Sequence, residues 1–176
     1  ESGLEKQDLT IARQVIDEGR ALLIAVNKWD ACADRPAALA RVRDRLQRSL
    51  SQSEGLPVEP VSALRGQNLD RLMAAIFALR EVWERRVPTA ALNRWLTSTT
   101  QAHPPPAPSG RRIKLRYMTQ AKTRPPTFVI FCSRPKALPA SYVRYLENSL
   151  RTDFKLPGTP IRIHLRKSEN PYAPER

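Results

Sequence analysis

The sequence predicts two small domains: an α/β layer with a parallel sheet over residues 1–87, then an α+β domain of order α-β-β-α-β over residues 88–176. Three observations support this prediction. Apolar runs alternate with amphipathic helical patterns in the first part, and strands of alternating polarity appear in the second. The composition also changes at Pro88, since thirteen of the 16 prolines lie from Pro88 onward.

Charge divides at the same point of the chain. Residues 1–87 contain 14 Lys and Arg against 13 Asp and Glu, whereas residues 88–176 contain 16 against 4, so nearly all of the net charge of +13 lies in the second part. Such an asymmetry predicts a polyanionic partner, with RNA as the first expectation. The alternative is a solvated basic surface that only aids solubility.

Two cysteines, Cys32 and Cys132, are present, and their spacing fits no metal-binding motif. We therefore predict no metal site and two reduced thiols in a cytoplasmic protein. No apolar run approaches the roughly 20 residues that span a bilayer, so no membrane partner is expected. The chain starts with Glu-Ser-Gly rather than Met, and we expect it to be part of a longer gene product.

The first part is predicted to alternate helix, strand, helix, strand, helix. Asp8 is a candidate cap for a first helix that stops near Gly19. Residues 21–26 are a continuous apolar run, as expected for a parallel strand buried on both faces. A second helix is expected over residues 36–50 and a short strand over residues 58–61. The third helix has Asn68 as its cap and apolar residues at helical spacing: Leu69, Leu72, Met73, Ile76, Leu79 and Trp83.

The second part is predicted to form a sheet backed by helices. A helix over residues 89–99 leads into a proline-rich extended loop over residues 103–110. Two paired strands, a helix over residues 141–153 and a last strand at residues 161–166 follow, in an antiparallel or mixed sheet. One face packs on the helices and the other is cationic. The alternating residues expected on the inner face of the first strand are Ile113, Leu115 and Tyr117.

The segment Asn27-Lys28-Trp29-Asp30 follows the buried strand, where open α/β sheets place their ligands. The Asp30 carboxylate can accept two parallel hydrogen bonds from N1–H and the N2 amine of guanine, a pair of donors that adenine lacks. Asn27 can reach N7 and tie neighbouring loops together, and the aliphatic stem of Lys28 can lie against the base. The pattern predicts a guanine-binding loop.

Ser62-Ala63-Leu64 follows the next short strand. The backbone amide of Ala63 can donate to guanine O6, an atom that adenine replaces with a donor, and Ser62 can brace the loop. The two motifs occur in the right order, each after a strand, with a helix between them. The alternative is that Asn27 and Asp30 only form a turn and cap a helix.

With these motifs, the sequence resembles the EngA/Der family of ribosome-assembly GTPases, which have two tandem G domains. The resemblance also rests on Gln7-Asp8, on residues 138–150, on Gly158-Thr-Pro-Ile-Arg-Ile163 and on Asn170-Pro171-Tyr172. It implies that residues 1–87 are the distal half of a P-loop GTPase domain and that residues 88–176 are a KH-like domain. The implied role is GTP-dependent maturation of the large ribosomal subunit, with GTP or GDP bound.

The phosphate-binding half of a GTPase has no counterpart in this sequence. A GxxxxGK[ST] loop, the groups that hold Mg²⁺ and the switch segments are absent. We therefore expect no catalytic residue in this chain, no hydrolysis by the chain alone, and Mg²⁺ binding through residues of the complete protein. The preceding G domains of the same protein are expected partners.

The basic half also departs from true KH domains, because Gly110 and Gly158 form no GxxG loop. Sequence-specific reading of RNA is therefore not expected. Non-specific contacts with rRNA phosphates are the favoured hypothesis, and contact with a neighbouring G domain is the alternative. On that alternative the chain is a non-catalytic RNA- or protein-binding module. The candidate residues are Lys114, Arg116, Arg162, His164 and Arg166.

Overall fold

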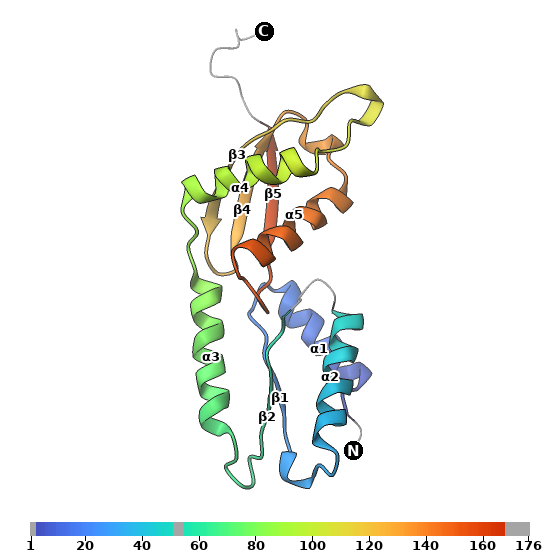
Figure 1. Cartoon of the computed structure of the whole chain (residues 1–176), viewed down its shortest axis with the longest axis vertical. Coiled ribbons are helices and arrows are strands. Elements are labelled where there is room, and N and C mark those ends of the chain that lie inside the picture. Colours follow the sequence, from blue (N-terminus) through green and yellow to red (C-terminus); the bar gives the residue numbers. More distant parts are fainter. Residues whose placement is uncertain (1–2, 51–54, 168–176) are drawn as a thin grey trace. The chain divides into compact units, whose positions relative to one another are not determined.

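The structure is a computed structural model, and it describes residues 3–50 and 55–167 (Figure 1). The chain divides into two compact units. The first unit comprises Glu1–Arg85 together with Lys155–Pro160, and the second comprises Arg86–Phe154 together with Ile161–Arg176. No sequence pattern identified above marks residues 155–160 as part of the first unit. Asn170-Pro171-Tyr172 lies outside the described residues.

The first unit is a short parallel sheet with helices. Strands β1 and β2 pair in parallel, with Ile24 opposite Val58 and Val26 opposite Pro60. Because the strands are parallel, the loops that follow them start from the same edge of the sheet. The elements in chain order are α1 (Lys6–Asp17), β1 (Ile24–Val26), the 3₁₀ helix η1 (Trp29–Ala31), α2 (Arg35–Ser49), β2 (Val58–Pro60) and α3 (Leu69–Glu84).

Neither of the two side chains expected to cap helices of this unit, those of Asp8 and Asn68, acts as an N-cap. The N-cap of α1 is Glu5, and the Asp8 carboxylate accepts from the Glu5 amide at 2.9 Å as the far half of a capping box. Asn68 precedes α3 in the left-handed region (φ 60°), and its side chain donates to Pro60 O at 2.9 Å instead of capping the helix. Asp34 caps α2 by accepting from the Ala37 amide.

The core of the first unit lies between α1, α2 and the sheet. Its buried members are Ala12, Val42, Leu46, Leu50 and Val58. The expectation of a strand buried on both faces is wrong for β1, because Ala25 is exposed. The apolar stripe of α3 is also only partly buried: Leu79 is covered, but four apolar side chains stay between 38% and 56% exposed. They are Leu69, Met73, Ile76 and Phe77.

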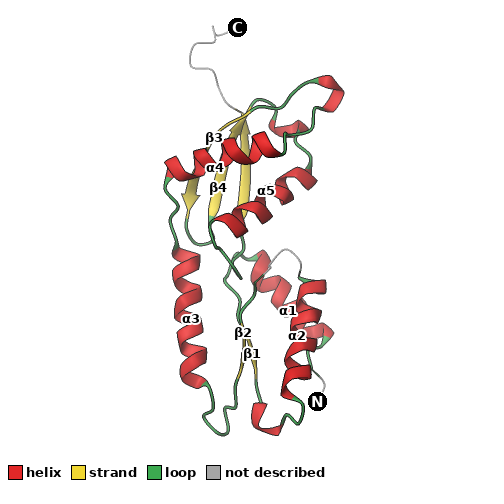
Figure 2. Ribbon diagram, viewed as in Figure 1, coloured by secondary structure: helices red, strands yellow, loops and turns green. Residues whose placement is uncertain are grey.

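The second unit is a three-stranded mixed sheet of order β3-β4-β5, antiparallel between β3 and β4 and parallel between β4 and β5. Helices α4 and α5 lie on one face of this sheet (Figure 2). The elements in chain order are α4 (Thr89–Ala102), the 3₁₀ helix η3 (Pro108–Gly110), β3 (Leu115–Lys122), β4 (Thr127–Cys132), the 3₁₀ helix η4 (Pro135–Ala137), α5 (Ala140–Asp153) and β5 (Arg162–Lys167).

Helix α4 closes the free edge of β3. The Asn93 side chain accepts from the Met118 amide and donates to the Met118 carbonyl, each at 2.9 Å. An amide side chain thereby replaces a neighbouring strand, which satisfies two backbone groups that an open edge leaves unpaired. The fully buried apolar side chains of this unit include Leu92, Met118, Phe128, Ile130, Leu146 and Leu150.

The alternation predicted for the first strand of the second unit is wrong beyond Leu115. Ile113 is buried, but Tyr117 is 45% exposed and Met118 is fully buried. The cause is a register shift between Leu115 and Tyr117, where β3 has one residue more than β4. Such a bulge reverses the inward and outward faces of the residues that follow it.

The proline-rich loop is anchored at its start. Helix α4 runs past the predicted end at residue 99 and stops at Ala102. His103 follows, and its carbonyl accepts from the Tyr142 hydroxyl at 2.7 Å, while its ring Nδ1 lies 3.0 Å from the Tyr145 hydroxyl. Within the described residues, no helix has the length and apolar character required to cross a membrane.

Candidate functional site

The two motifs singled out in the sequence meet beyond the carboxyl ends of β1 and β2. The ladder continues past the strands, because the Val61 amide donates to Val26 O at 2.9 Å and the Trp29 amide donates to Val61 O at 3.0 Å. Trp29 is buried, which fixes the loop to the unit beneath it. This arrangement brings residues 27–30 and 62–63 together.

Asn27 joins the two loops directly. Its Oδ1 accepts from the Lys28 amide at 2.8 Å and from the Ala63 amide at 3.0 Å. Lys28 takes the left-handed conformation (φ 59°, ψ 34°), which turns the chain sharply between the strand and η1. The loop-tying role expected of Asn27 is present. The amide expected to bind guanine O6 is thus already a donor to Asn27, and a base would share it.

Asp30 and Ser62 form the second link. The Ser62 hydroxyl donates to Asp30 Oδ1 at 2.5 Å, and Ser62 Oγ accepts from the Arg65 amide at 3.1 Å. Ser62 is fully buried, whereas Asp30 is only partly covered. The hydrogen bond from Ser62 holds the pKa of Asp30 below its ordinary value, against an opposing contribution from desolvation. The carboxylate is therefore ionised and oriented at neutral pH.

A tight turn shapes the second loop. Ser62 and Gln67 exchange two backbone hydrogen bonds of 3.1 Å each, which close the turn of residues 63–66. Gly66 occupies it at φ +66°, a conformation that favours glycine. Leu64 is 86% exposed, so its side chain takes no part in these links. Sequence reasoning missed Arg65 and Gln67, although the glycine between Arg65 and Gln67 signals a turn.

The assembled loops can recognise a planar group with two adjacent N–H donors. Asp30 offers an ionised carboxylate, and one of its two oxygens already holds a defined direction through Ser62. Asn27, whose Oδ1 accepts from the Ala63 amide, also has an amide donor. This donor and acceptor set fits the edge of guanine and leaves adenine mismatched.

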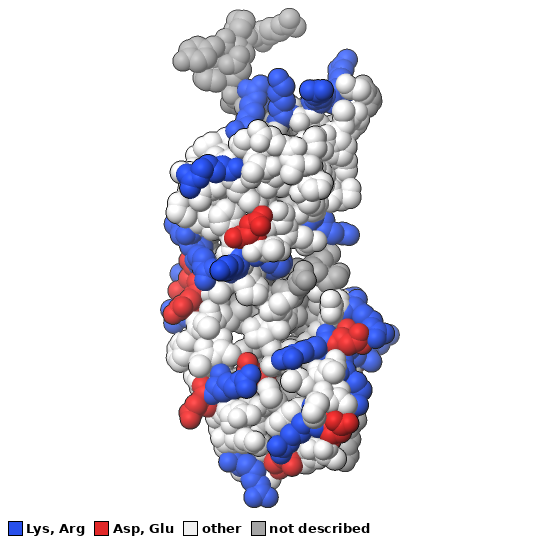
Figure 3. All heavy atoms as spheres, in the orientation of Figure 1, with Lys and Arg blue, Asp and Glu red and all other residues white. Residues whose placement is uncertain are grey.

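The five predicted RNA-binding residues are all exposed. On β5, Arg162, His164 and Arg166 alternate with the half-buried Ile163 and Leu165, so the three polar side chains share the outer face of the sheet, opposite the helices. The other two lie at the start of β3, which β4 separates from β5: Arg116 is the extra residue of the bulge, and Lys114 precedes β3. On the face drawn in Figure 3, basic side chains of the second unit outnumber acidic ones.

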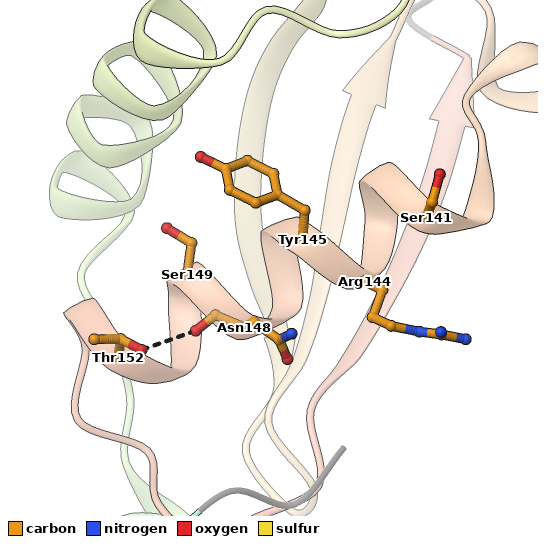
Figure 4. A pocket seen from close by; sticks show the side chains of 6 residues that line it. All are labelled: Ser141, Arg144, Tyr145, Asn148, Ser149 and Thr152. Atoms are coloured by element: carbon orange, nitrogen blue, oxygen red, sulfur yellow. Dashed lines mark hydrogen bonds between the residues drawn. The ribbon is translucent and has the colours of Figure 1, made fainter. Parts of the chain in front are cut away.

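A shallow hollow runs along α5 (Figure 4). Its lining comes from one helix surface, and the Tyr145 hydroxyl already meets His103. This arrangement has no converging charged groups of the kind that Asp30 and its neighbours provide. The hollow is lined by Ser141, Arg144, Tyr145, Asn148, Ser149 and Thr152. The described residues also contain no cluster of His, Cys, Asp or Glu suited to a metal ion.

Known sequences resemble this chain over almost its whole length. GTPase Der of Dinoroseobacter shibae is 57% identical over 170 residues, which are 96% of this chain and 35% of that protein. GTPase Der of Rhodopseudomonas palustris is 55% identical over 172 residues, 98% of this chain and 37% of that protein. GTPase Der of a Ruegeria species is 58% identical over 170 residues, which are 96% of this chain and 35% of that protein. The chain thus spans about a third of the length of these relatives.

A family match covers the second unit. Residues 86–166 match the family described as the KH-domain-like C-terminal domain of EngA bacterial GTPase enzymes. The same residues contain α4, the three-stranded sheet and α5. Together with the relatives above, this match places the present sequence in the C-terminal part of such proteins. The chain belongs to the EngA/Der family of bacterial GTPases.

Proposed function

We propose that this chain is the guanine-recognising and RNA-docking part of a protein that binds and hydrolyses GTP and acts in the cytoplasm on the large ribosomal subunit. The observation that supports it best is the pair of links between the loops, Ser62 to Asp30 and Ala63 to Asn27. These links hold a carboxylate, a carboxamide and a backbone amide at one edge of the sheet. Guanine is the base whose edge matches all three.

Each residue has a defined part in base selection. Asp30 accepts from N1–H and the N2 amine, and a base without these donors leaves the carboxylate unpaired. The Ala63 amide donates to O6 while Asn27 donates to N7. The stem of Lys28 covers one face of the ring. Leu64 acts through the backbone of the turn, since its side chain is 86% exposed.

We propose that the first unit is the distal half of a P-loop GTPase domain. The exposed apolar side chains of α3 and the exposure of Ala25 support this, because a self-sufficient domain covers such surfaces. The relatives are also almost three times as long as this chain. On this proposal the phosphate loop, the Mg²⁺ ligands and the switches are supplied by other parts of the protein, and this chain alone does not hydrolyse GTP.

The second unit is proposed to dock on rRNA. Its outer face carries exposed basic side chains, and such contacts with phosphates release counterions and weaken as salt rises. The proposed contact residues are Lys114, Arg116, Arg162, His164 and Arg166. The alternative is that this face docks on a preceding G domain and the chain is a non-catalytic binding module.

The guanine assignment is tested by Asp30→Asn in the complete protein. An amide at this position has one acceptor oxygen and one donor nitrogen, so it matches N1–H and the C2 oxygen of xanthine but cannot accept from N1–H and the N2 amine of guanine together. Preference should therefore shift from GTP toward xanthosine triphosphate. Competition between the two nucleotides measures this preference. Asp34→Asn, a helix cap on the same loop, is the matched control and keeps GTP selectivity. Unchanged selectivity of Asp30→Asn would remove the assignment.

The RNA assignment has a separate test. Replacing Arg162 and Arg166 by Gln should weaken rRNA binding. It should also reduce the magnitude of the slope of log binding constant against log salt concentration by about 1 per lost phosphate contact. The salt series is followed by fluorescence anisotropy on the complete protein. If neither affinity nor slope changes, the basic face contacts a G domain instead.

A further inference from the structure

An aromatic pair lies on the outer face of the sheet of the second unit. Tyr117 and Phe131 are cross-strand neighbours in register, with ring centroids 6.0 Å apart and planes inclined by 45°. Phe131 is in turn paired with Arg166 of β5. Paired residues of adjacent strands point to the same face of a sheet. One row across the three strands therefore presents two aromatic rings and a guanidinium together.

The exposure of Tyr117 is built into the strand. The bulge at Arg116 turns Tyr117 outward and Met118 inward, and the two side chains are 45% and 0% exposed. Without this extra residue, the same alternation would bury the tyrosine against the helices. An aromatic side chain is thereby held half in solvent on a rigid strand, which is the arrangement that stacking on a flat ligand requires.

The surroundings of the pair are cationic. His164 and Arg162 follow Arg166 at alternate positions of β5 and lie on the same face. Among the described residues of the second unit, the acidic side chains are Glu147 and Asp153, and both belong to α5 on the helical side. The described part of the outer face therefore carries aromatic rings and positive charge without a carboxylate.

We propose that this face binds unpaired nucleotides of single-stranded RNA, with a base stacked on Tyr117 beside Phe131 and the adjoining phosphates held by Arg166 and His164. The inference rests on the proposed RNA-docking function and adds the class of RNA and the residues that grip the bases. Exposed aromatics on a sheet suit splayed bases, whose faces a duplex hides. An acidic protein segment matches the cations but makes no use of the exposed rings.

The test compares Tyr117→Ala with Tyr117→Phe in the complete chain. The probes are a fluorescein-labelled oligouridylate and an RNA hairpin, titrated by anisotropy over a series of KCl concentrations. Loss of the ring should weaken oligouridylate binding roughly 5- to 100-fold, the range of one stacked base, with an unchanged salt slope. Tyr117→Phe keeps the ring and should bind as the unchanged chain does.

Two controls separate stacking from charge and from misfolding. Phe77→Ala removes another exposed aromatic, on α3 of the first unit, and should leave RNA affinity unchanged. Arg166→Gln should reduce the salt slope by about 1, and Tyr117→Ala should still weaken oligouridylate binding when it is combined with Arg166→Gln. Circular dichroism of Tyr117→Ala establishes that the sheet is intact. Oligouridylate carrying 5-iodouridine should form a photo-crosslink to the peptide that contains Tyr117.

Three results would overturn the proposal. Equal affinity of Tyr117→Ala and the unchanged chain, with a slope that still responds to Arg166→Gln, removes stacking and leaves the RNA-docking function standing. If neither the affinity responds to Tyr117→Ala nor the salt slope to Arg166→Gln, the RNA-docking function is removed as well. A Tyr117→Ala effect seen only in binding of a purified G domain of the same protein assigns the face to a protein contact.

Discussion

The hydroxyl of Ser62 donates a 2.5 Å hydrogen bond to the carboxylate of Asp30, across 32 residues of sequence. Ser62 is fully buried, and its Oγ also accepts from the Arg65 amide. One small side chain therefore fixes both the direction of the carboxylate and the start of the turn that follows β2.

Replacing Ser62 by Ala should weaken binding of GDP to the complete protein by about 10- to 150-fold, because an oriented hydrogen bond to a charged group contributes about 1.5–3 kcal/mol. The pKa of Asp30 should return upward toward its ordinary value, since the Ser62 hydroxyl is the main cause of its depression. Isothermal titration calorimetry measures the affinity. Ser98→Ala, which removes a hydroxyl bonded within α4, is the control. Equal affinities for the two variants would contradict the prediction.

Gly158 is predicted to tolerate no side chain. It lies at φ +63°, and an added Cβ would stand 2.8 Å from Pro57 Cδ and 3.4 Å from Gly55 O. Gly158→Ala should lower the free energy of unfolding by about 2 kcal/mol or more, from strain and overpacking together. Gly110→Ala has a similar φ of +71° but open space around it, and it measures the strain alone. Urea unfolding gives both values, and equal losses would exclude a packing clash.

Asn93 is predicted to stabilise the second unit through the edge of β3. Asn93→Ala leaves the amide and the carbonyl of Met118 without this partner, at a cost of about 1–3 kcal/mol in the free energy of unfolding. Asn93→Asp still accepts from the amide but places a negative charge against the carbonyl, so it should be no more stable than Asn93→Ala at neutral pH. Thermal unfolding of the three proteins tests the order. Arg94→Ala on the exposed side of the same helix is the control.

Glu147 gives the stability of the second unit a distinct pH dependence. Burial raises the pKa of this carboxyl, and the charges of Arg151 and Arg144 oppose the shift only in part. Because the pKa of Glu147 is raised in the folded state, its contribution to the free energy of unfolding is present at low pH and is lost as pH rises through that pKa. Glu147→Gln should therefore raise the melting temperature at neutral pH, and the difference should vanish in acid. The exposed Glu81→Gln, on α3 of the first unit, is the control substitution.

Much of the fold and site was accessible from sequence. The continuous apolar run of residues 21–26 and the short strand at Val58 predicted two parallel strands, and parallel strands bring the residues after them to one edge. That geometry places Asn27 and Asp30 beside Ser62 and Ala63. The positions of the two motifs directly after the two strands were thus enough to predict that their residues lie together.

Other features depend on contacts that sequence patterns do not encode. The bulge at Arg116 reverses the faces of β3, and an alternation rule assumes that no such extra residue exists. The half-exposed stripe of α3 has helical periodicity, but periodicity alone does not report whether a partner covers it. Asn68 is a residue type that often caps helices. Its side chain instead donates to the Pro60 carbonyl, because the turn before Asn68 brings that carbonyl within reach.

Residues 155–160 belong to the first unit but are synthesised after most of the second unit. The Arg85 side chain donates to Lys155 O, and Gly55 and Leu79 lie against residues 157–158. On the ribosome, the residues of the proposed guanine site emerge well before this segment, which follows α4 and α5. The first unit therefore acquires its last piece only when most of the second has been translated. A product truncated before residue 155 therefore carries every residue of the proposed guanine site on a first unit that lacks one of its segments.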